Sequence, residues 1–452
     1  MRAELLVRGG TLVTADEVRP ADLAVAGGRV LAVLPAGAAC EAETTLAAGG
    51  KHLLPGLVDC HVHFNEPGRA HWEGFATGTA AAAAGGVTTI MDMPLNSSPP
   101  TLDGVALRLK QDTVRDLALV DYALWGGLTG ENLASLPELE AGGVVALKAF
   151  MCNSGLAEYP PVDDAALYEA LLHTAATGTL VGLHAENECL TAHFGRREQD
   201  AARLGPDAWA HARPGFTEEE AVQRALLLAR ETGARVHFVH VSTPAAVRAV
   251  SRAKTEGVRA TLETCPHYLS LTDDDLVRLG AIAKCAPPLR PAAVVDELWQ
   301  AVLAGEIDCI ASDHSPCSPD EKDKGRDNIW CAWGGIAGLQ TMLPVLLTEG
   351  VARRNLPLTQ LVRLTSGNPA RLFGLAPGKG SLKEGSDADI AIVDLEQTWT
   401  LRAEQLKTRW PLSPFVGRTF RGLVETTIVR GQVVFRNGNV VGSPGSGRLL
   451  RP

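Results

Sequence analysis

The spacing of hydrophobic residues changes twice along the chain, and these changes divide it into three zones. Residues 1–53 alternate short apolar runs with glycine-containing turns, a pattern typical of strands joined by tight connections. Residues 387–441 show the same pattern. Neither end is large enough for a comfortable core of its own. We therefore expect the two ends to pack together as one small flanking β-sandwich domain.

Between the two ends, apolar runs typical of buried strands alternate with amphipathic helical stretches. This alternation predicts an α/β fold, with a (β/α)8 TIM barrel over residues 54–374 and a flanking domain built from residues 1–53 and 375–452. An open doubly wound sheet is the alternative, but it would usually carry a phosphate-binding glycine-rich first turn, which the chain lacks. The expected strands cover residues 54–62, 87–93, 119–126, 143–150, 179–184, 235–240, 258–263 and 307–312.

Two helices have legible ends. Thr217 followed by Glu220 predicts a capping box at the start of one helix, and Gly233 predicts its end. The second helix is expected from about residue 291 to 304, ending at Gly305. The buried face of the first helix should consist of Val222, Ala225, Leu226 and Ala229.

Composition and charge narrow the possible functions. The 452 residues would suggest about three domains at ~150 residues each, but the strand pattern reduces this to one barrel and one discontinuous β-domain. A hydrophobic fraction of 46% excludes wholesale disorder. The net charge of −10, without a basic block, argues against nucleic acid or an anionic membrane as the main partner. Nine cysteines without a CxxC pair, and the lack of a signal-like or membrane-spanning apolar run, lead us to expect a soluble cytoplasmic protein.

His61 and His63 are the first candidates for chemistry. They lie two positions apart at the end of an apolar strand, so both side chains point to the same face, here the barrel interior. Two buried imidazoles without partners would cost several kcal/mol, and a shared metal ion removes that cost. The alternative is a pair of core histidines satisfied by hydrogen bonds.

Other expected strands end in matching polar residues. Catalytic groups of TIM barrels lie at the carboxyl ends of the strands, so these side chains should converge with the histidine pair. A buried lysine among metal ligands is unusual, but a neutral lysine can react with carbon dioxide to form a carbamate that bridges two ions. Imidazole and oxygen ligands suit Zn²⁺, with Co²⁺ or Mn²⁺ possible. The residues are Lys148, His184, His240 and Asp313.

These motifs make the sequence recognisable. DCHVH at 59–63, the strand-end lysine and histidines, SDH at 312–314 and GSDADIAIVD at 385–394 resemble the metal-dependent amidohydrolase superfamily over essentially the whole chain. Within it, the cyclic amidases of the allantoinase family are most similar, through FNEPG at 64–68, DMPLNS at 92–97, SPC at 315–317 and AWGGI at 332–336.

Two positions depart from the neighbouring families. Dihydroorotases carry an arginine for the substrate carboxylate where this chain has Asn65, and allantoin has no carboxylate to meet. Hydantoinases carry a tyrosine where this chain has Asn153. Both comparisons rest on the resemblance and favour allantoin as substrate.

The resemblance implies a mechanism and a cofactor. His61, His63 and Asp313 are expected to hold one divalent ion and His184 and His240 a second, most simply Zn²⁺, with carboxylated Lys148 between the ions. A hydroxide bridging the metals would attack the ring carbonyl, and Asp313 would carry its proton to the ring nitrogen, giving allantoate in purine (ureide) catabolism. Lys148 and Asp313 are thus the expected catalytic residues, and a homotetramer is the assembly that the resemblance implies.

Substrate contacts follow less directly from the sequence. Polar residues in the loops after the strands are candidates, with loop capping as the alternative, and the backbone of residues 284–288 could also face the ring. His237 lies off the His240 face and should be structural, whereas His267 and His314 should orient ligands. Residues 374–379 imitate a phosphate loop, but their glycine spacing is one residue short. The candidate substrate contacts are Asn65, Asn96, Asn153, Ser154 and Ser315.

Two alternative functions stay open. The same chemistry could act on dihydroorotate or on a hydantoin or dihydropyrimidine, against which Asn65 and Asn153 argue. A relative without activity that serves as an assembly protein would be expected to lose metal ligands, and all six candidate ligands are present.

Overall fold

The computed structural model describes residues 2–452. All eight expected barrel strands are present, and they run parallel in chain order. Each is shorter than expected, because the pattern of apolar residues extends beyond the paired segment. The strands are β6 (Leu57–Val62), β7 (Val87–Asp92), β8 (Asp121–Leu124) continued by β9 (Gly126–Gly127), β10 (Leu147–Phe150), β11 (Leu180–His184), β12 (Arg235–Phe238), β13 (Ala260–Thr264) and β14 (Cys309–Ile310).

Two sets of hydrogen bonds join these strands into a ring. At the break between β8 and β9, the Val145 amide donates to the Leu124 carbonyl at 3.0 Å. At the seam between the last and first strands, the His63 amide donates to the His314 carbonyl at 2.7 Å, and residue 314 forms a parallel bridge with Val62. The expected barrel is therefore present in the structure.

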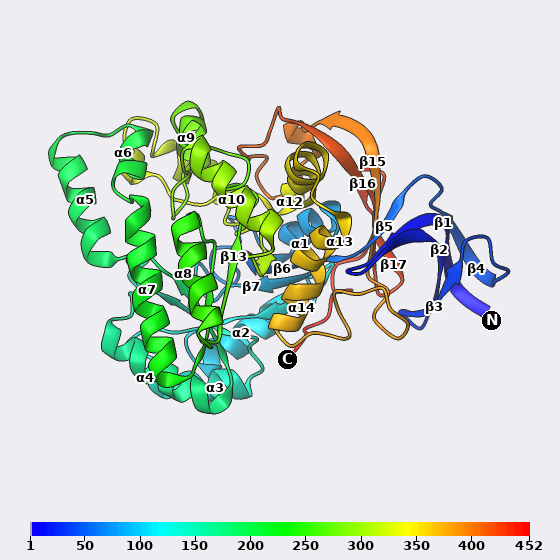
Figure 1. The fold of residues 1–452 in the computed structure, drawn as a ribbon, viewed down its shortest axis with the longest axis horizontal. Helices are drawn as coiled ribbons and strands as arrows, with labels where there is room; N and C mark the ends of the chain where they lie inside the picture. Colours follow the sequence, from blue (N-terminus) through cyan, green and yellow to red (C-terminus); the bar gives the residue numbers. More distant parts are fainter. Residues whose placement is uncertain (1) are drawn as a thin grey trace.

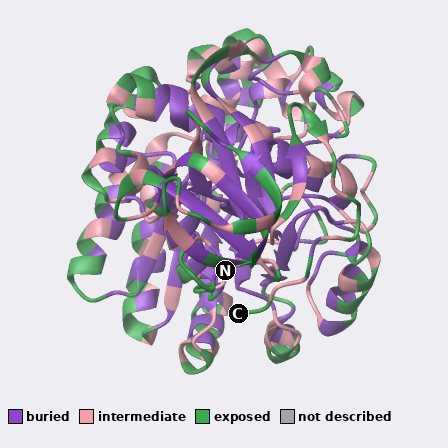
Figure 2. Cartoon of the chain, turned by 90° about the vertical axis from the view of Figure 1, so that its right-hand side faces the viewer, coloured by how far each residue is buried: buried purple, intermediate pink, exposed green. Residues whose placement is uncertain are grey.

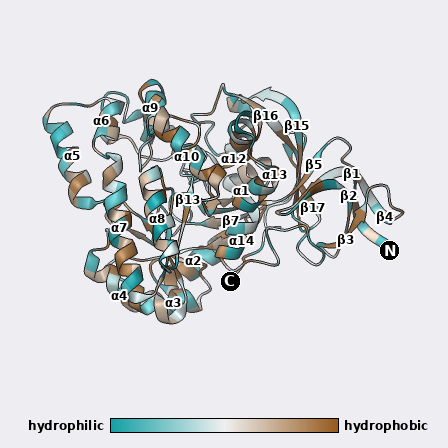
Figure 3. Cartoon of the chain, in the orientation of Figure 1, coloured by the Kyte–Doolittle hydropathy of each residue, from teal (hydrophilic) through white to brown (hydrophobic). Residues whose placement is uncertain are grey.

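Helices cover the outside of this ring (Figure 1). Their inner faces are apolar and their outer faces hydrophilic (Figure 3), while the strands at the centre are buried (Figure 2). Among residues 2–452, no helix is both long and apolar enough to cross a membrane. The helices are α1 (Phe75–Ala84), α2 (Gly104–Val114), α3 (Leu136–Ala141), α4 (Asp164–Thr177), α5 (Glu188–Asp200), α6 (Pro206–His211), α7 (Gly215–Thr232), α8 (Pro244–Thr255), α9 (Asp273–Leu279), α10 (Ala292–Ala304), α11 (Pro319–Asp323), α12 (Met342–Val345), α13 (Leu358–Val362) and α14 (Asn368–Leu372).

Both chain ends contribute to one β-unit beside the barrel (Figure 1). Its nine strands form a single branched sheet, with β5 joining β1 to β15. Both chain ends therefore contribute to one sheet, as expected, and its packing as a sandwich stays a prediction. Strands from the start of the chain are β1 (Arg2–Val13), β2 (Val18–Ala26), β3 (Arg29–Pro35), β4 (Glu41–Ala47) and β5 (His52–Pro55). Those from the end are β15 (Ile390–Thr400), β16 (Thr419–Val429), β17 (Gln432–Arg436) and β18 (Asn439–Val440).

Candidate active site

Three of the expected metal ligands converge at the carboxyl end of β6. Nε2 of His61 lies 3.3 Å from Nε2 of His63 and 3.3 Å from Oδ1 of Asp313, while His63 Nε2 lies 3.5 Å from the same oxygen. All three side chains are buried. Burial alone would raise the pKa of Asp313, but the neighbouring histidines hold that pKa at about 2. The three ligand atoms thus present a carboxylate and two imidazoles to one point.

Lys148 stands on β10 with its ammonium group inside the barrel. Its side chain is fully buried, and within residues 2–452 its Nζ has no hydrogen-bond partner. The ring of Phe150 lies beside it, with its centroid 4.9 Å from Nζ. Burial lowers the pKa of this lysine to about 8. Burying an unpartnered lysine costs free energy, which distinguishes Lys148 from an ordinary core residue.

His184 and His240 form the second cluster, close to the first. Their ring centroids lie 4.5 Å apart, and the ring of His240 lies 5.4 Å from that of His61. Nε2 of His184 donates to Glu186 at 2.7 Å, which leaves Nδ1 as its ligand atom. Nδ1 of His240 is buried without a partner among the described residues. Burial, the first cause in both cases, lowers the pKa of both histidines, so they are neutral and able to bind a metal.

Backbone strain marks two of these positions. His240 has φ 40° and Asp313 has φ 45°, both in the left-handed region that non-glycine residues seldom adopt. They lie two and three residues beyond the ends of their strands, where the chain leaves the barrel wall. Such strain persists only where the surrounding structure fixes it, and it is frequent at functional sites.

Glu263 on β13 connects the first cluster to the barrel interior. Its carboxylate accepts from Nδ1 of His61 at 2.5 Å, from Nε2 of His237 at 3.2 Å and from the backbone amide of His240 at 3.2 Å. Nδ1 of His237 in turn lies 2.8 Å from the hydroxyl of Thr261. His237 is therefore buried and hydrogen-bonded to the same carboxylate as His61, and its structural role stays a prediction. Glu263 was absent from the expected site, although it stands at the end of an expected strand, as the predicted ligands do.

Of the remaining histidines, His314 holds the barrel seam through its carbonyl, and its Nε2 lies 3.5 Å from a carboxylate oxygen of Glu73. His267 is buried, and burial lowers its pKa to about 4. In the described chain no residue pairs with Nε2 of His267. Within residues 2–452 neither imidazole is hydrogen-bonded to a proposed ligand atom, so their role in orienting ligands stays a prediction.

The ligand side chains open into one cavity of about 570 Å³. Four of the five expected substrate contacts line it, whereas Asn65 does not: its side chain is buried and donates to the Pro316 carbonyl at 3.3 Å. Residues 284–286 also line the cavity, and Nζ of Lys284 donates to the carbonyls of Ile329 and Ala332. The four lining contacts are Asn96, Asn153, Ser154 and Ser315.

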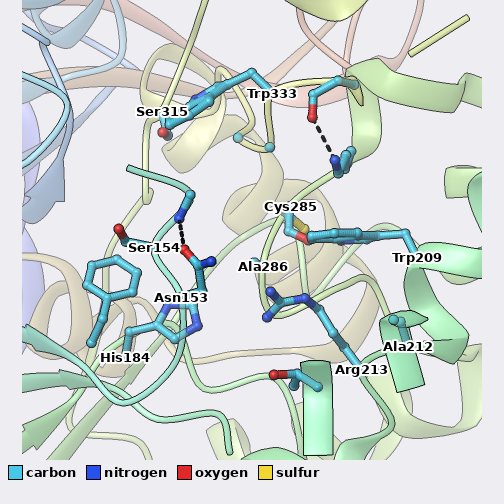
Figure 4. Close-up of a pocket in the computed structure, with 18 of the residues that line it drawn as sticks. Asn153, Ser154, His184, Trp209, Ala212, Arg213, Cys285, Ala286, Ser315 and Trp333 are labelled. Carbon is cyan, nitrogen blue, oxygen red and sulfur yellow. Dashed lines mark hydrogen bonds between the residues drawn. The ribbon is translucent and has the colours of Figure 1, made fainter. Parts of the chain in front are cut away.

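Arg213 and Trp209 form the cavity wall that sequence reasoning missed. Both line the cavity, and the guanidinium carbon of Arg213 lies 4.6 Å from the Trp209 ring (Figure 4). A short ion pair joins Arg213 to Glu186, the carboxylate that holds His184. These residues come from the helices between β11 and β12 and from the residues that join them, far from any strand end. Nothing in the sequence pattern therefore pointed to them.

Comparison with known proteins agrees with this geometry. The model of the amidohydrolase family matches residues 52–434, and the chain belongs to this family of hydrolases. Within it the chain falls among the allantoinases, which act on a cyclic amide. It is 48% identical to an allantoinase of Deinococcus radiodurans, over 100% of this chain and 99% of that protein. It is 49% identical to an allantoinase of Rubrobacter xylanophilus, over 99% and 98% of the two chains.

Solved structures give the same fold. The L-hydantoinase (dihydropyrimidinase) from Arthrobacter aurescens has a TM-score of 0.97 at 36% identity, with all of both chains covered. A dihydropyrimidinase from Brevibacillus agri has a TM-score of 0.92 at 33% identity, covering 99% of each chain. The barrel and the sheet from both chain ends are thus those of a cyclic amidase.

Proposed function

We propose that this chain hydrolyses allantoin to allantoate, in the degradation of purines. One ring amide C–N bond breaks, the carbonyl carbon takes the hydroxyl of water, and the ring nitrogen takes its proton. The observation that carries the proposal is the convergence of His61, His63 and Asp313 at 3.3–3.5 Å beside a buried, unpartnered Lys148 Nζ in the described chain. Full-length similarity to allantoinases supports the choice of substrate.

The side chains present fit a centre of two divalent ions. Ligand atoms 3.3–3.5 Å apart have the spacing of groups bound at roughly 2.0–2.2 Å around one tetrahedral ion. His61, His63 and Asp313 would hold the first ion, and His184 and His240 the second. Lys148 as N6-carboxylysine would lie between them, which removes the cost of its unpartnered ammonium. Nitrogen and oxygen ligands without thiolate suit Zn²⁺, with Co²⁺ or Mn²⁺ as alternatives.

The residues of the chain then have separate tasks. Such ions, when bound, polarise a carbonyl oxygen and lower the pKa of water. The Asp313 carboxylate takes a proton from the attacking water and returns it to the departing ring nitrogen. Ser315, Asn153 and Asn96 line the cavity beside this point and offer hydroxyl and amide groups to the ring. Phe150, stacked on His184 with ring centroids 4.6 Å apart, limits the movement of that ligand.

Variants of Lys148 test the bridging role. We expect Lys148→Ala to lose bound metal and at least 10²-fold in allantoin turnover, with partial recovery when a short carboxylic acid is added to replace the carbamate oxygens. Lys148→Arg, which keeps the charge but cannot form the carbamate, should lose metal without this recovery. Metal analysis and turnover measure both effects. Undiminished activity of Lys148→Ala without added acid would overturn the bridging role.

A second candidate function has one observation in its favour. The structural similarity to the Arthrobacter L-hydantoinase covers all of both chains, which favours a hydantoin or dihydropyrimidine as substrate. Asn153 in the cavity wall argues against this substrate, because hydantoinases, by family resemblance, carry a tyrosine at that position. Turnover of allantoin, hydantoin and dihydroorotate by the metal-loaded enzyme distinguishes the candidates, and faster turnover of either competitor would replace our choice.

We also propose that the chain acts in the cytoplasm as a homotetramer. Exposed apolar side chains on two neighbouring helices support self-association: Tyr168 and Leu172 on α4 and Leu227 on α7 are 37%, 42% and 54% exposed. Light scattering of the purified protein measures the assembly, and a monomer at micromolar concentration would contradict the tetramer.

A further inference from the structure

Arg213 places a fixed positive charge inside the cavity. It lies directly before the Pro214 cap of α7, and its side chain is only 11% exposed. The guanidinium stacks on Trp209 and pairs with Glu186, so two contacts on different elements fix its orientation. Figure 4 shows it directed into the cavity, between His184 on one side and Trp209 on the other. None of the catalytic steps derived above uses this group.

Donors of this guanidinium remain for a ligand. The group carries five N–H donors, and its hydrogen-bond partner within residues 2–452 is the Glu186 carboxylate. None of its nitrogens is a buried atom without a partner, so the remaining donors face the cavity instead of protein. The carboxylate of Glu186 offsets the charge, which favours a neutral acceptor over an anion. A carbonyl oxygen of a neutral ligand has the chemistry that fits.

Arg213 is linked to the proposed metal centre through Glu186 and His184. Arg213 pairs with Glu186, and Glu186 accepts from Nε2 of His184, a proposed metal ligand. Arg213 also lines the cavity into which the proposed metal ligands open, so one bound molecule can reach both. In allantoin the ring carbon next to that carbonyl carries a ureido arm, CO–NH₂ on nitrogen, which hydantoin lacks. The amide of Asn153 lines the same cavity and can meet the ureido N–H groups.

We propose that Arg213 is the specificity-determining residue that binds the ureido carbonyl of the substrate, with Trp209 as the flat wall behind the guanidinium. This inference rests on the proposed function and deepens it. Because Glu186 and Trp209 fix the guanidinium before the substrate arrives, little conformational entropy is lost on binding. A hydrogen bond from a charged donor of this kind discriminates about 10- to 100-fold against a ligand without the acceptor.

Arg213→Lys tests the proposal with the least disturbance. Lysine keeps a positive charge for Glu186 but loses the planar fork and the free donors. We expect kcat/KM for allantoin to fall about 10- to 100-fold, while the turnover of hydantoin, or its inhibition constant against allantoin hydrolysis, changes less than about 3-fold. Bound metal should stay at the wild-type level. Arg197→Lys, at an exposed arginine of α5 that does not line the cavity, is the matched control and should change neither kcat/KM for allantoin nor the turnover of hydantoin.

A second variant guards against a disturbed Glu186. In Arg213→Met/Glu186→Gln both charges are removed together, so no carboxylate is left buried without its partner. With activities normalised to bound metal, the preference for allantoin over hydantoin should fall as much as in Arg213→Lys. An equal loss for allantoin and hydantoin in both variants would show that Arg213 only positions His184, and no loss would show that it does not contact the substrate. Either result overturns this inference alone. Absence of allantoin turnover in the metal-loaded wild type overturns the proposed function itself.

Discussion

The Glu263 carboxylate orients His61, a proposed metal ligand, through the ring nitrogen that does not face the metal site. It accepts from Nδ1 of His61 at 2.5 Å, which leaves Nε2 of that histidine for a metal. We expect Glu263→Gln to weaken metal affinity by about 10- to 100-fold, because an amide is a weaker acceptor and can turn its NH₂ toward His61. Titration of the metal-free protein with Zn²⁺ measures the affinity.

Two variants calibrate that result. Thr261→Val removes the hydroxyl beside Nδ1 of His237, one contact further from the site, and should have a smaller effect. Glu297→Gln on the exposed face of α10 is the matched control and should leave the affinity unchanged. Equal affinities of Glu263→Gln and the control would contradict the positioning role.

Lys284 makes stability depend on pH. Burial lowers the pKa of its ammonium from 10.5 to about 7, although Nζ donates to two backbone carbonyls, because a neutral amine can keep both contacts. In the unfolded chain the lysine keeps its proton up to pH near 10.5, so between the two pKa values the unfolded state binds more protons than the folded state. The free energy of unfolding must therefore rise with pH across this window and lose this contribution as the pH falls through it.

The prediction is a difference between two pH profiles. From pH ~7 to ~9 the wild type should gain up to about 2 kcal/mol relative to Lys284→Met, which has no titrating group there. Urea unfolding at each pH gives both profiles, and subtraction removes other titrating groups. The exposed Lys383→Met should follow the wild type. Parallel profiles for wild type and Lys284→Met would contradict the lowered pKa.

At the scale of elements, strand ends were predictable because they combine two signals in a few residues. A short apolar run followed by a polar residue identifies both the strand and the direction in which its last side chain points. His184, for example, closes β11, and His240 and Asp313 lie two and three residues beyond the ends of β12 and β14. Glu263 gave the same signal in β13 and was overlooked. Arg213 carries no such signal, because a loop between helices has no hydrophobic periodicity that shows which side chain points into the barrel.

Helix ends were predicted better at the carboxyl side than at the amino side. Gly233 and Gly305 end α7 and α10 with φ 73° and 77°, since glycine adopts the left-handed conformation without strain. The capping box at Thr217 was wrong. Helix α7 begins at Gly215, with Pro214 as its cap, and the Thr217 hydroxyl donates to the Pro214 carbonyl at 2.8 Å within the first turn. The expected buried face of α7 is confirmed.

For the whole molecule, the return of both chain ends to one sheet was predictable, but the path of the last residues was not. Residues 445–450 leave the sheet and run back along the barrel, where the Leu450 amide donates to the Tyr122 carbonyl at 2.7 Å. This stretch, GSGRLL, is too short and too polar to show a period. The expected boundaries at residues 53/54 and 374/375 stay a prediction.

A buried ionic cluster joins the barrel to the sheet, and it explains a lysine that the sequence left without a role. Nζ of Lys379 lies 2.5 Å from Asp121 on β8, 2.7 Å from Asp389 and 2.9 Å from Asp387, the last two just before β15. Arg430, between β16 and β17, also pairs with Asp121. The loop that imitated a phosphate site therefore supplies a cation to three carboxylates of its own chain.

Removing that cation should leave the carboxylates buried without sufficient positive charge. We expect Lys379→Met to lower the free energy of unfolding by about 3–5 kcal/mol, because breaking a buried ion pair exposes the full cost of desolvation. Burial already raises the pKa of Asp389, so the deficit in unfolding free energy should shrink as the pH falls and the carboxylates take up protons.

Adding Asp389→Asn to Lys379→Met should recover part of the lost stability at neutral pH. Urea unfolding measures both variants beside Lys383→Met, the control at an exposed lysine four residues further on. A deficit below about 1 kcal/mol, typical of exposed pairs, would show that the cluster does not hold the sheet to the barrel.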